Sequence, residues 1–426
     1  MDEGCNAGAG KAAHRERRNT ACLELYQVIV RAGWIFKTET IIMPAVLDAV
    51  VDSGLLRGFL PVLNRGGQSL TPLFFSAALA RRPRKKWTLV GTTLAMAACF
   101  AALAVAWGPV KASRPDVLAI VFLVLYAVFS AANGLTQLAA AALQGKLVPV
   151  GHRGRAMVVS VVIGSVLAIV AALALLGPWL AEADGFAKIF GITAVFFAVA
   201  AVVPALLDEP PDPVAARPRG EAVASRWSGM AGWRRTLAHD PALVRLCLVA
   251  ACFSAVLMLF PHYQAFARDR LGSGRDSLLT WVIVQNAATG VVSLFAGPFA
   301  DRRGTRLVLV WLVALSAFTP LLVTGLSLLP HAVAVGWFWI VYAALGLNPI
   351  SLKIFTNYAL ELAPAPAEHP RYVSIVGVAL AAPFVLSPLI GLAIDRVGFR
   401  PMFVLGAALI ATGAAVGLGL PEPRRP

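Results

Sequence analysis

Long apolar runs alternate with short charged segments along most of this chain. A helix needs about 20 mostly apolar residues to cross the ~30 Å hydrocarbon layer of a membrane. One run, 307–352, is long enough for two crossings, with an interruption at Leu329, Pro330 and His331. Together the runs that contain no Asp, Glu, Lys or Arg predict ten spanning helices, within residues 87–110, 117–145, 156–181, 189–207, 246–267, 277–300, 307–352, 372–394 and 401–421.

The preceding segment, 21–82, is also mainly apolar, but charged residues interrupt it throughout. The sequence Val-Asp-Ser-Gly at 51–54 is a turn signal in its middle. We therefore expect two further helices, over residues 23–50 and 56–80, whose charged side chains face a protein interior or a water-filled cavity. The expected total is twelve membrane-spanning helices.

The composition excludes an ordinary soluble protein. The 426 residues are 58% hydrophobic and 14% charged, and the mean hydropathy is +0.75. Soluble domains are about a quarter charged, so too few charged residues are present here to cover soluble domains of this total length. The net charge of +15 would suggest nucleic acid in a soluble protein. In an all-α membrane protein the same charge follows from topology, so the expected partner is the lipid bilayer and not nucleic acid.

The placement of Lys and Arg predicts the orientation of the chain. If both termini are cytoplasmic, 23 of these residues fall on cytoplasmic segments and 9 on outside loops. Such an excess on the inside is typical of multi-pass membrane proteins. The first twenty residues contain no apolar signal-peptide region. The chain thus divides into a cytoplasmic tail (1–20), a six-helix bundle (21–207), a cytoplasmic linker (208–240), a second six-helix bundle (241–420) and a short cytoplasmic tail (421–426).

One predicted cytoplasmic loop carries a specific motif. Residues 297–306 have the sequence GPFADRRGTR, which closely resembles the GxLaDRxGRR loop of the major facilitator superfamily. The resemblance implies a transporter fold of two pseudo-symmetric six-helix bundles that works by alternating access. It also assigns a cytoplasmic gate to Gly297, Asp301, Arg302, Gly304 and Arg306.

The corresponding loop of the first half departs from this pattern. Arg81 stands where the family keeps an acid, and Arg84 where it keeps a glycine, which places the carboxylate-centred lock of this loop in doubt. Other family-like segments cover the rest of the chain. They are 149–155, 208–210, 364–371, 391–400 and 421–424, and the loop RPRKK with the segment FKTETIIMPAVLDAV resembles a bacterial subgroup of these permeases.

Polar residues inside the predicted helices mark candidate cavity positions. The resemblance implies that the first, fourth, seventh and tenth helices line a central cavity, and each of them carries polar groups. On the first helix the spacing of Lys37, Thr40 and Asp48 predicts one shared face. The candidate cavity residues are Lys37, Thr40, Asp48, Arg65, Asn133, Gln137, His262, Gln285, Asn348, Lys353 and Asn357.

The charged members of this set have two open interpretations. A charge at mid-membrane costs at least ~2.5 kcal/mol, so each one needs a reason. Glu39 and Asp48 are either proton-titrating carboxylates or members of ion pairs. The cations Lys37, Arg65 and Lys353 either attract an anionic substrate or pair with these carboxylates, and pairing is favoured. Three cations against two carboxylates still favour a small organic anion as cargo.

No pattern for enzyme chemistry is present. The chain has no GxSxG, HExxH or phosphate-binding loop, and its cysteines form no CxxC pair. We expect no enzyme activity, no cofactor and no metal site. The prediction is a monomeric secondary-active transporter of the bacterial inner membrane that moves a small organic solute, with proton coupling as a hypothesis. The alternative is a transporter-fold sensor or assembly partner that does not transport.

Overall fold

The structure is a computed structural model of the chain, and it describes residues 2–148, 162–182, 184–212, 233–365 and 368–422. Within these ranges every regular element is a helix. Ten of the described helical segments are long and apolar enough to cross a membrane, which confirms the ten predicted from the apolar runs. They are Lys86–Ser113, Pro115–Leu147, Val162–Ala181, Gly185–Leu206, Pro241–Leu271, Asp276–Ala296, Thr305–Leu326, His331–Leu362, Arg371–Val397 and Phe399–Leu418.

The longest apolar run forms two helices, as predicted. Helix α12 (Thr305–Leu326) ends just before the interruption, and α13 (His331–Trp337) begins directly after Pro330. The missing backbone N–H of proline is tolerated before a first helical turn, so Pro330 favours a new helix there. The helices α14 (Trp339–Leu345) and α15 (Asn348–Leu362) continue this second crossing.

The prediction of one helix over 23–50 was wrong. Helix α1 (Asp2–Trp34) is followed by a short 3₁₀ turn, η1 (Ile35–Lys37), and α2 (Ile42–Asp48) begins only after four non-helical residues. Pro44 gives the physical reason, because a proline ring clashes with the carbonyl four residues earlier in a continuous helix. The predicted shared face of Lys37, Thr40 and Asp48 is therefore wrong, because a shared face requires that the three residues lie on one continuous helix. The second predicted helix, by contrast, is present as α3 (Gly54–Ala80).

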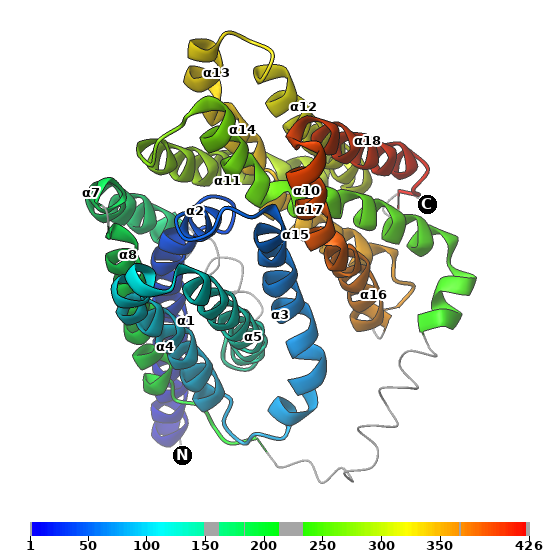
Figure 1. The fold of residues 1–426 in the computed structure, drawn as a ribbon. Helices are drawn as coiled ribbons and strands as arrows, with labels where there is room; N and C mark the ends of the chain where they lie inside the picture. The colour runs from blue at the N-terminus through cyan, green and yellow to red at the C-terminus, as the bar shows by residue number, and fades with distance from the viewer. Residues whose placement is uncertain (1, 149–161, 183, 213–232, 366–367, 423–426) are drawn as a thin grey trace. The chain divides into compact units, whose positions relative to one another are not determined.

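The chain separates into two compact units. The first contains residues 1–38 and 66–216. In it α4 (Lys86–Ser113) packs against both α5 (Pro115–Leu147) and α8 (Gly185–Val202), and α1 packs along α8 (Figure 1). A core of aromatic rings fills the space between these helices, and its members include Phe100, Trp107, Phe129, Phe190 and Phe197.

The second unit contains residues 39–65 and 217–426. Its central helix is α10 (Pro241–Leu271), which contacts α12, α16 (His369–Ala381), α18 (Phe399–Leu418) and α2. Helix α11 (Asp276–Arg303) packs against α14, and α17 (Ser387–Val397) precedes α18. By its contacts, segment 39–65 thus belongs with the second unit, whereas the predicted bundles 21–207 and 241–420 divide the chain at the linker. That division stays a prediction.

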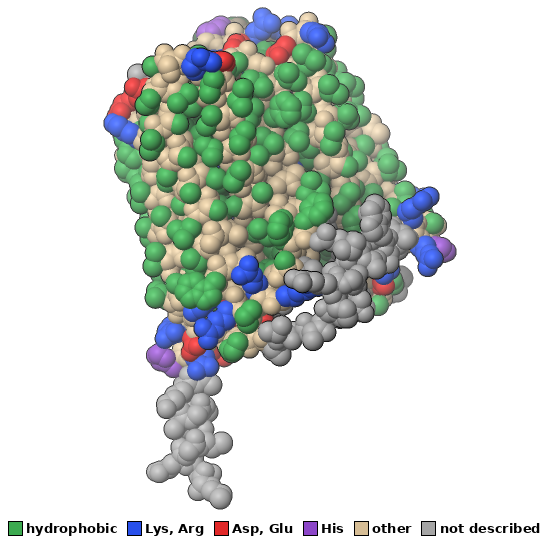
Figure 2. All heavy atoms as spheres, turned by 60° about the horizontal axis from the view of Figure 1, so that its bottom comes forward, with side chains coloured by type: hydrophobic (Ala, Val, Ile, Leu, Met, Phe, Trp, Pro, Cys, Tyr) green, Lys and Arg blue, Asp and Glu red, His purple; other side chains and the backbone are tan. Residues whose placement is uncertain are grey.

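The helices expose large apolar side chains. Val105 is 78% exposed, Leu294 70% and Phe318 62%. Figure 2 shows hydrophobic side chains over much of the visible face, with charged side chains gathered toward its margins. Exposure on this scale is a liability in water but is expected of helices that face lipid. The chain is therefore a multi-pass membrane protein.

Candidate functional site

Five charged residues of the second unit converge where four helices end or begin. This charge cluster consists of Asp48, Asp52, Arg57, Arg268 and Asp395, from the end of α2, the turn after it, α3, α10 and α17. Nη1 of Arg57 lies 2.6 Å from Oδ1 of Asp48 and 2.9 Å from Oδ1 of Asp52. The side chains of Arg57 and Asp48 are both only 2% exposed. Removing one partner of a buried ion pair strongly destabilises the folded protein, because the other charge is left buried without compensation.

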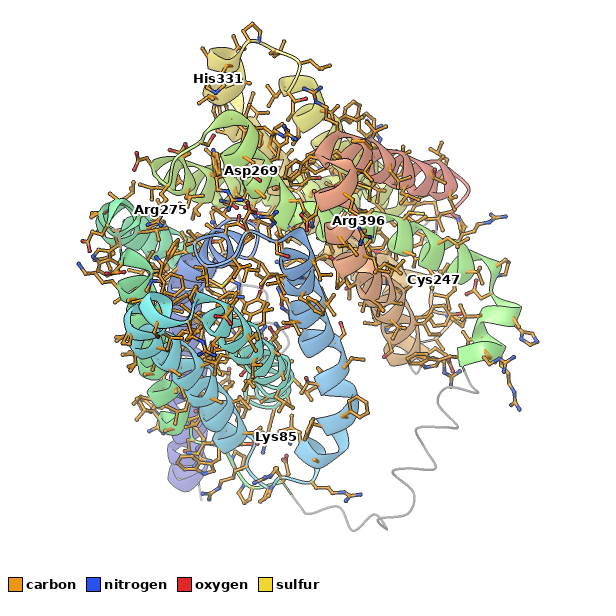
Figure 3. All side chains as sticks on the ribbon, viewed as in Figure 1. Lys85, Cys247, Asp269, Arg275, His331 and Arg396 are labelled. Atoms are coloured by element: carbon orange, nitrogen blue, oxygen red, sulfur yellow. The ribbon has the colours of Figure 1, made fainter. Side chains whose placement is uncertain are left out.

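Arg268 completes the cluster from α10. Its Nη1 lies 3.1 Å from Oδ2 of Asp48, and its Nη2 donates to Oδ1 of Asp52 at 2.7 Å. Partial burial acts to raise the pKa of Asp52, but the hydrogen bonds from Arg268 and Arg57 outweigh it and hold that pKa below its usual range. Figure 3 labels Asp269, the next residue of α10, which accepts a hydrogen bond from Nε of Arg268 at 2.6 Å. Arg57 and Arg268 thus share the carboxylates of Asp48 and Asp52.

Asp395 joins α17 to the first turn of α3. Its carboxylate oxygens accept the backbone N–H of Gly54 at 2.9 and 3.0 Å and that of Leu55 at 3.3 Å. A carboxylate in this place satisfies the unpaired donors of a helix N-terminus and interacts favourably with its dipole. Figure 3 labels Arg396 beside it on α17. Asp395 was not among the predicted site residues, although it lies in the family-like segment 391–400.

Glycines allow α3 and α17 to approach closely. A Cβ atom at Gly58 would lie 2.5 Å from the carbonyl oxygen of Ser387, and one at Gly391 would overlap the carbonyl of Gly54. Small residues at a helix crossing permit such backbone contact. The contact and the charge cluster together hold α3 against α17 and α10.

Two predicted cavity residues meet in the same unit. The hydroxyl of Thr40 donates to Oε1 of Gln285 at 2.6 Å, which joins the segment before α2 to α11.

His262 is fully buried on α10, and neither of its ring nitrogens has a hydrogen-bond partner in the described part of the chain. Its neighbour Pro261 lies inside the helix.

Lys37 lies in an aromatic cage of the first unit. Its ammonium nitrogen is 3.8 Å from the ring centroid of Trp34, 4.7 Å from that of Phe129 and 5.9 Å from that of Tyr126. The side chain is fully buried, and cation–π contacts stabilise a cation most when it is desolvated. Asn133, one turn beyond Phe129 on α5, is also buried, and its amide nitrogen has no hydrogen-bond partner among the described residues.

The remaining cavity candidates are dispersed. Asn348 is buried and donates to the carbonyl of Leu345 at 3.0 Å, so it supports the local helix. The other predicted residues are exposed or partly exposed: Gln137 on α5, Lys353 and Asn357 on α15, Arg65 on α3, and Glu39 in the non-helical segment between η1 and α2.

The motif at 297–306 is mostly helical. Helix α11 continues through Arg303, so only Gly304, with a φ of 100°, separates it from α12. Arg302 is exposed, and Nη2 of Arg306 donates to the carbonyl of Leu418 at 3.0 Å. The surroundings of Gly297 and the side chain of Asp301 lie outside what the structure describes, as does the motif at 149–155.

In the first unit a carboxylate from the linker contacts the basic loop between α3 and α4. Glu209 accepts the backbone N–H of Lys85 at 2.9 Å and of Lys86 at 2.8 Å, at the start of α4. The ammonium of Lys146 lies 3.0 Å from Glu209 and 2.8 Å from Asp212, and Lys85, labelled in Figure 3, also pairs with Asp212. Hydrogen bonds from Lys146 and Lys85 hold the pKa of Asp212 below its usual range.

The role of Glu209 was not predicted from the sequence. Its Asp-Glu-Pro segment, 208–210, was noted only as a family-like exit from a helix. An acid directly after an apolar run, followed by proline, was the available signal. Because two of its partners, Lys85 and Lys86, lie more than 120 residues earlier, only the folded chain could assign them.

The fold and these sites define a multi-pass helical membrane protein of the transporter type. A family model described as Major Facilitator Superfamily matches residues 39–347, and the chain belongs to this superfamily. A comparison with curated proteins finds no sequence match. Among the described residues, no group of three or more His, Cys, Asp or Glu side chains is placed to hold a metal ion.

Solved transporters share the fold at low sequence identity. A POT family transporter in complex with 5-aminolevulinic acid matches with a TM-score of 0.74 and 12% identity, over 96% of this chain and 97% of its own. A mutant of the nucleoside transporter NupG matches with a TM-score of 0.69 and 13% identity, over 94% of this chain and 99% of its own. A D-xylose-proton symporter matches with a TM-score of 0.68 and 13% identity, over 94% of this chain and 98% of its own.

Proposed function

We propose that this chain is a secondary-active transporter that moves a small organic solute by alternating access. The observation that carries the proposal is the closed contact around the charge cluster. There, Arg57 of α3 and Arg268 of α10 both bind Asp48 at the end of α2. The carboxylate of Asp395 and direct backbone contact at Gly54 and Gly391 tie α3 to α17. Such a contact is discrete and polar, so it can open and close as a unit.

The proposed topology has twelve helices in two six-helix bundles. The ten apolar spans are joined by α3 and by a first crossing built from α1, η1 and α2. Both termini and the linker 208–240 would lie in the cytoplasm of a bacterial cell, with the chain a monomer in the inner membrane. In this orientation the charge cluster lies at the outer side, and its helices α3 and α10 come from different bundles.

The transport cycle would then alternate two contacts. The charge cluster closes the outer side, and the region of Gly304 and Arg306 closes the cytoplasmic side. The non-helical segment 38–41 suits a binding site near the middle of the first crossing, because irregular backbone inside a membrane is tolerated where it lines a cavity. Thr40 and Gln285 are the proposed solute contacts beside it.

The cargo is proposed to be a small organic anion. Lys37, a buried cation held by aromatic rings within the first unit, is the proposed source of attraction for an anion. The structures with a similar fold include transporters described with nucleosides, D-xylose, peptides and 5-aminolevulinic acid, so the fold accommodates several classes of small solute.

Proton coupling is proposed through Glu39 or Asp48. Asp48 is bound to two arginines of the closed contact, so its protonation would weaken that contact directly. Glu39 lies in the non-helical segment between η1 and α2 and is partly exposed. Glu39→Gln and Asp48→Asn separate the two, and coupling is refuted if both variants keep the proton dependence of uptake.

Uptake by the reconstituted protein tests the function. Purified protein is first screened for thermal stabilisation by small carboxylates, sugars and nucleosides, and any stabilising compound is then offered to proteoliposomes with an imposed pH gradient. Binding of a ligand to the folded state raises the unfolding temperature. We expect a carboxylate to stabilise the protein and to accumulate in the vesicles. Stabilisation without any uptake would instead favour the sensor alternative.

A further inference from the structure

In the basic loop between α3 and α4, the lysines and the arginines differ in their contacts with the rest of the protein. The lysine ammonium groups turn toward the protein. Lys85 pairs with Asp212, and Nζ of Lys86 donates to the carbonyls of Ala205 and Leu207 at 3.0 and 2.7 Å. Their backbone N–H groups are bound by Glu209. The internal carboxylates of this region therefore bind the lysines.

The arginines of the same loop stay outside this network. Arg82 and Arg84 are exposed and Arg81 is partly exposed, and no ion pair or side-chain hydrogen bond joins any of the three to the described residues. Trp87, which follows the loop, is 55% exposed. Tryptophan is enriched at the boundary between the headgroups and the hydrocarbon of a membrane.

The loop is held in one conformation. The carbonyl of Pro83 accepts the backbone N–H of Asp212 at 2.8 Å, and Glu209 fixes the two residues that follow Arg84. The arginines on either side of Pro83 are therefore presented from a fixed backbone. A guanidinium binds a phosphate oxygen pair in a defined geometry, so a fixed backbone reduces the entropy lost on binding.

We propose that Arg82 and Arg84, supported by Arg81, bind the headgroup phosphate of an anionic phospholipid, with Trp87 at the level of the lipid interface. Charge complementarity selects this occupant, because clusters of basic residues next to a membrane helix attract anionic lipids. The inference requires that the chain spans a membrane but does not depend on transport. Arg81 adds a third cation to the same loop.

The test compares two pairs of substitutions with equal loss of charge. Purified protein is titrated with spin-labelled phosphatidylglycerol and, separately, with spin-labelled phosphatidylcholine, and the preference for the anionic lipid is measured from the motionally restricted signal. Arg82→Gln with Arg84→Gln is expected to lower this preference about 30-fold, at about fivefold per basic residue. Lys85→Gln with Lys86→Gln removes the same charge from the same loop and is expected to retain most of it.

The outcomes decide the proposal. An equal loss in both pairs would show that general loop charge and not a site attracts the lipid, and would overturn it. An unchanged preference in the arginine pair would also overturn it. Inorganic phosphate at the concentration of the labelled lipid is expected not to compete, and effective competition would point to a free-anion site instead. Thermal unfolding of each variant confirms folding, with the lysine pair expected to be the less stable.

Discussion

Removal of the Arg57 guanidinium tests whether the charge cluster closes the outer side of the transporter. The side chain is 2% exposed and contacts two carboxylates within 3 Å, at 2.6 and 2.9 Å. At an effective dielectric constant of about 20, two unit charges roughly 4 Å apart interact by about 4 kcal/mol. Removing one partner of a buried pair costs about 3–5 kcal/mol. Because Arg268 still binds Asp48 and Asp52, we take the lower value, about 3 kcal/mol, which shifts a closed–open equilibrium about 100-fold.

A cysteine at Ser387 reports this equilibrium. Ser387 is fully buried on α17 at its closest approach to Gly58, so a thiol there is shielded while the contact is closed. The assay measures the rate at which a membrane-impermeant maleimide, added outside, labels Ser387→Cys in a chain whose native cysteines are replaced by alanine. We expect Arg57→Gln to raise the labelling rate by as much as 100-fold, and Arg57→Lys to raise it less.

The matched control is Arg270→Gln. Arg270 is exposed on the same end of α10 and forms no ion pair with the described residues, so its loss removes one positive charge but no contact of the cluster. We expect its labelling rate to equal that of the parent. Equal rates in Arg57→Gln and Arg270→Gln would refute the role of the charge cluster in closure.

Three further predictions concern the other contacts. Glu209→Gln weakens the cap at the start of α4 and should cost about 1–2 kcal/mol, seen as a lower unfolding temperature, whereas Glu182→Gln, in an exposed ion pair, should change it little. The lowered pKa of Asp212 means that its stabilisation is complete above about pH 4, the unfolded-state value, and is lost as the pH falls further. Unfolding temperatures between pH 3 and 6 should therefore fall less steeply in Asp212→Asn than in the parent, and equal slopes would contradict this. Gly391→Ala should raise the labelling of Ser387→Cys because its Cβ overlaps the backbone of α3, whereas Gly377→Ala, with open space around it, should leave labelling unchanged.

The break in the first crossing shows where periodicity alone misled. The run 23–50 has the length of one helix, and its polar residues fit one face, but Pro44 disfavours a continuous helix through residue 40. The predicted helix ran through Pro44, and the break was found only in the structure. The division of the predicted face between two compact units, with Lys37 in one and Thr40 in the other, followed only in the structure.

The sequence by itself determined the class of protein and most of its spanning helices. In hydrocarbon every backbone polar group must be satisfied within its own segment, so a long apolar run has essentially one outcome, a helix. Charged side chains have many potential partners, and their choice depends on which helix ends meet. Arg57 could have paired with any nearby acid, yet it binds Asp48, and Arg268 joins them from more than 200 residues away. Only the tertiary structure decided those pairs, because burial energy depends on distances that the order of residues does not contain.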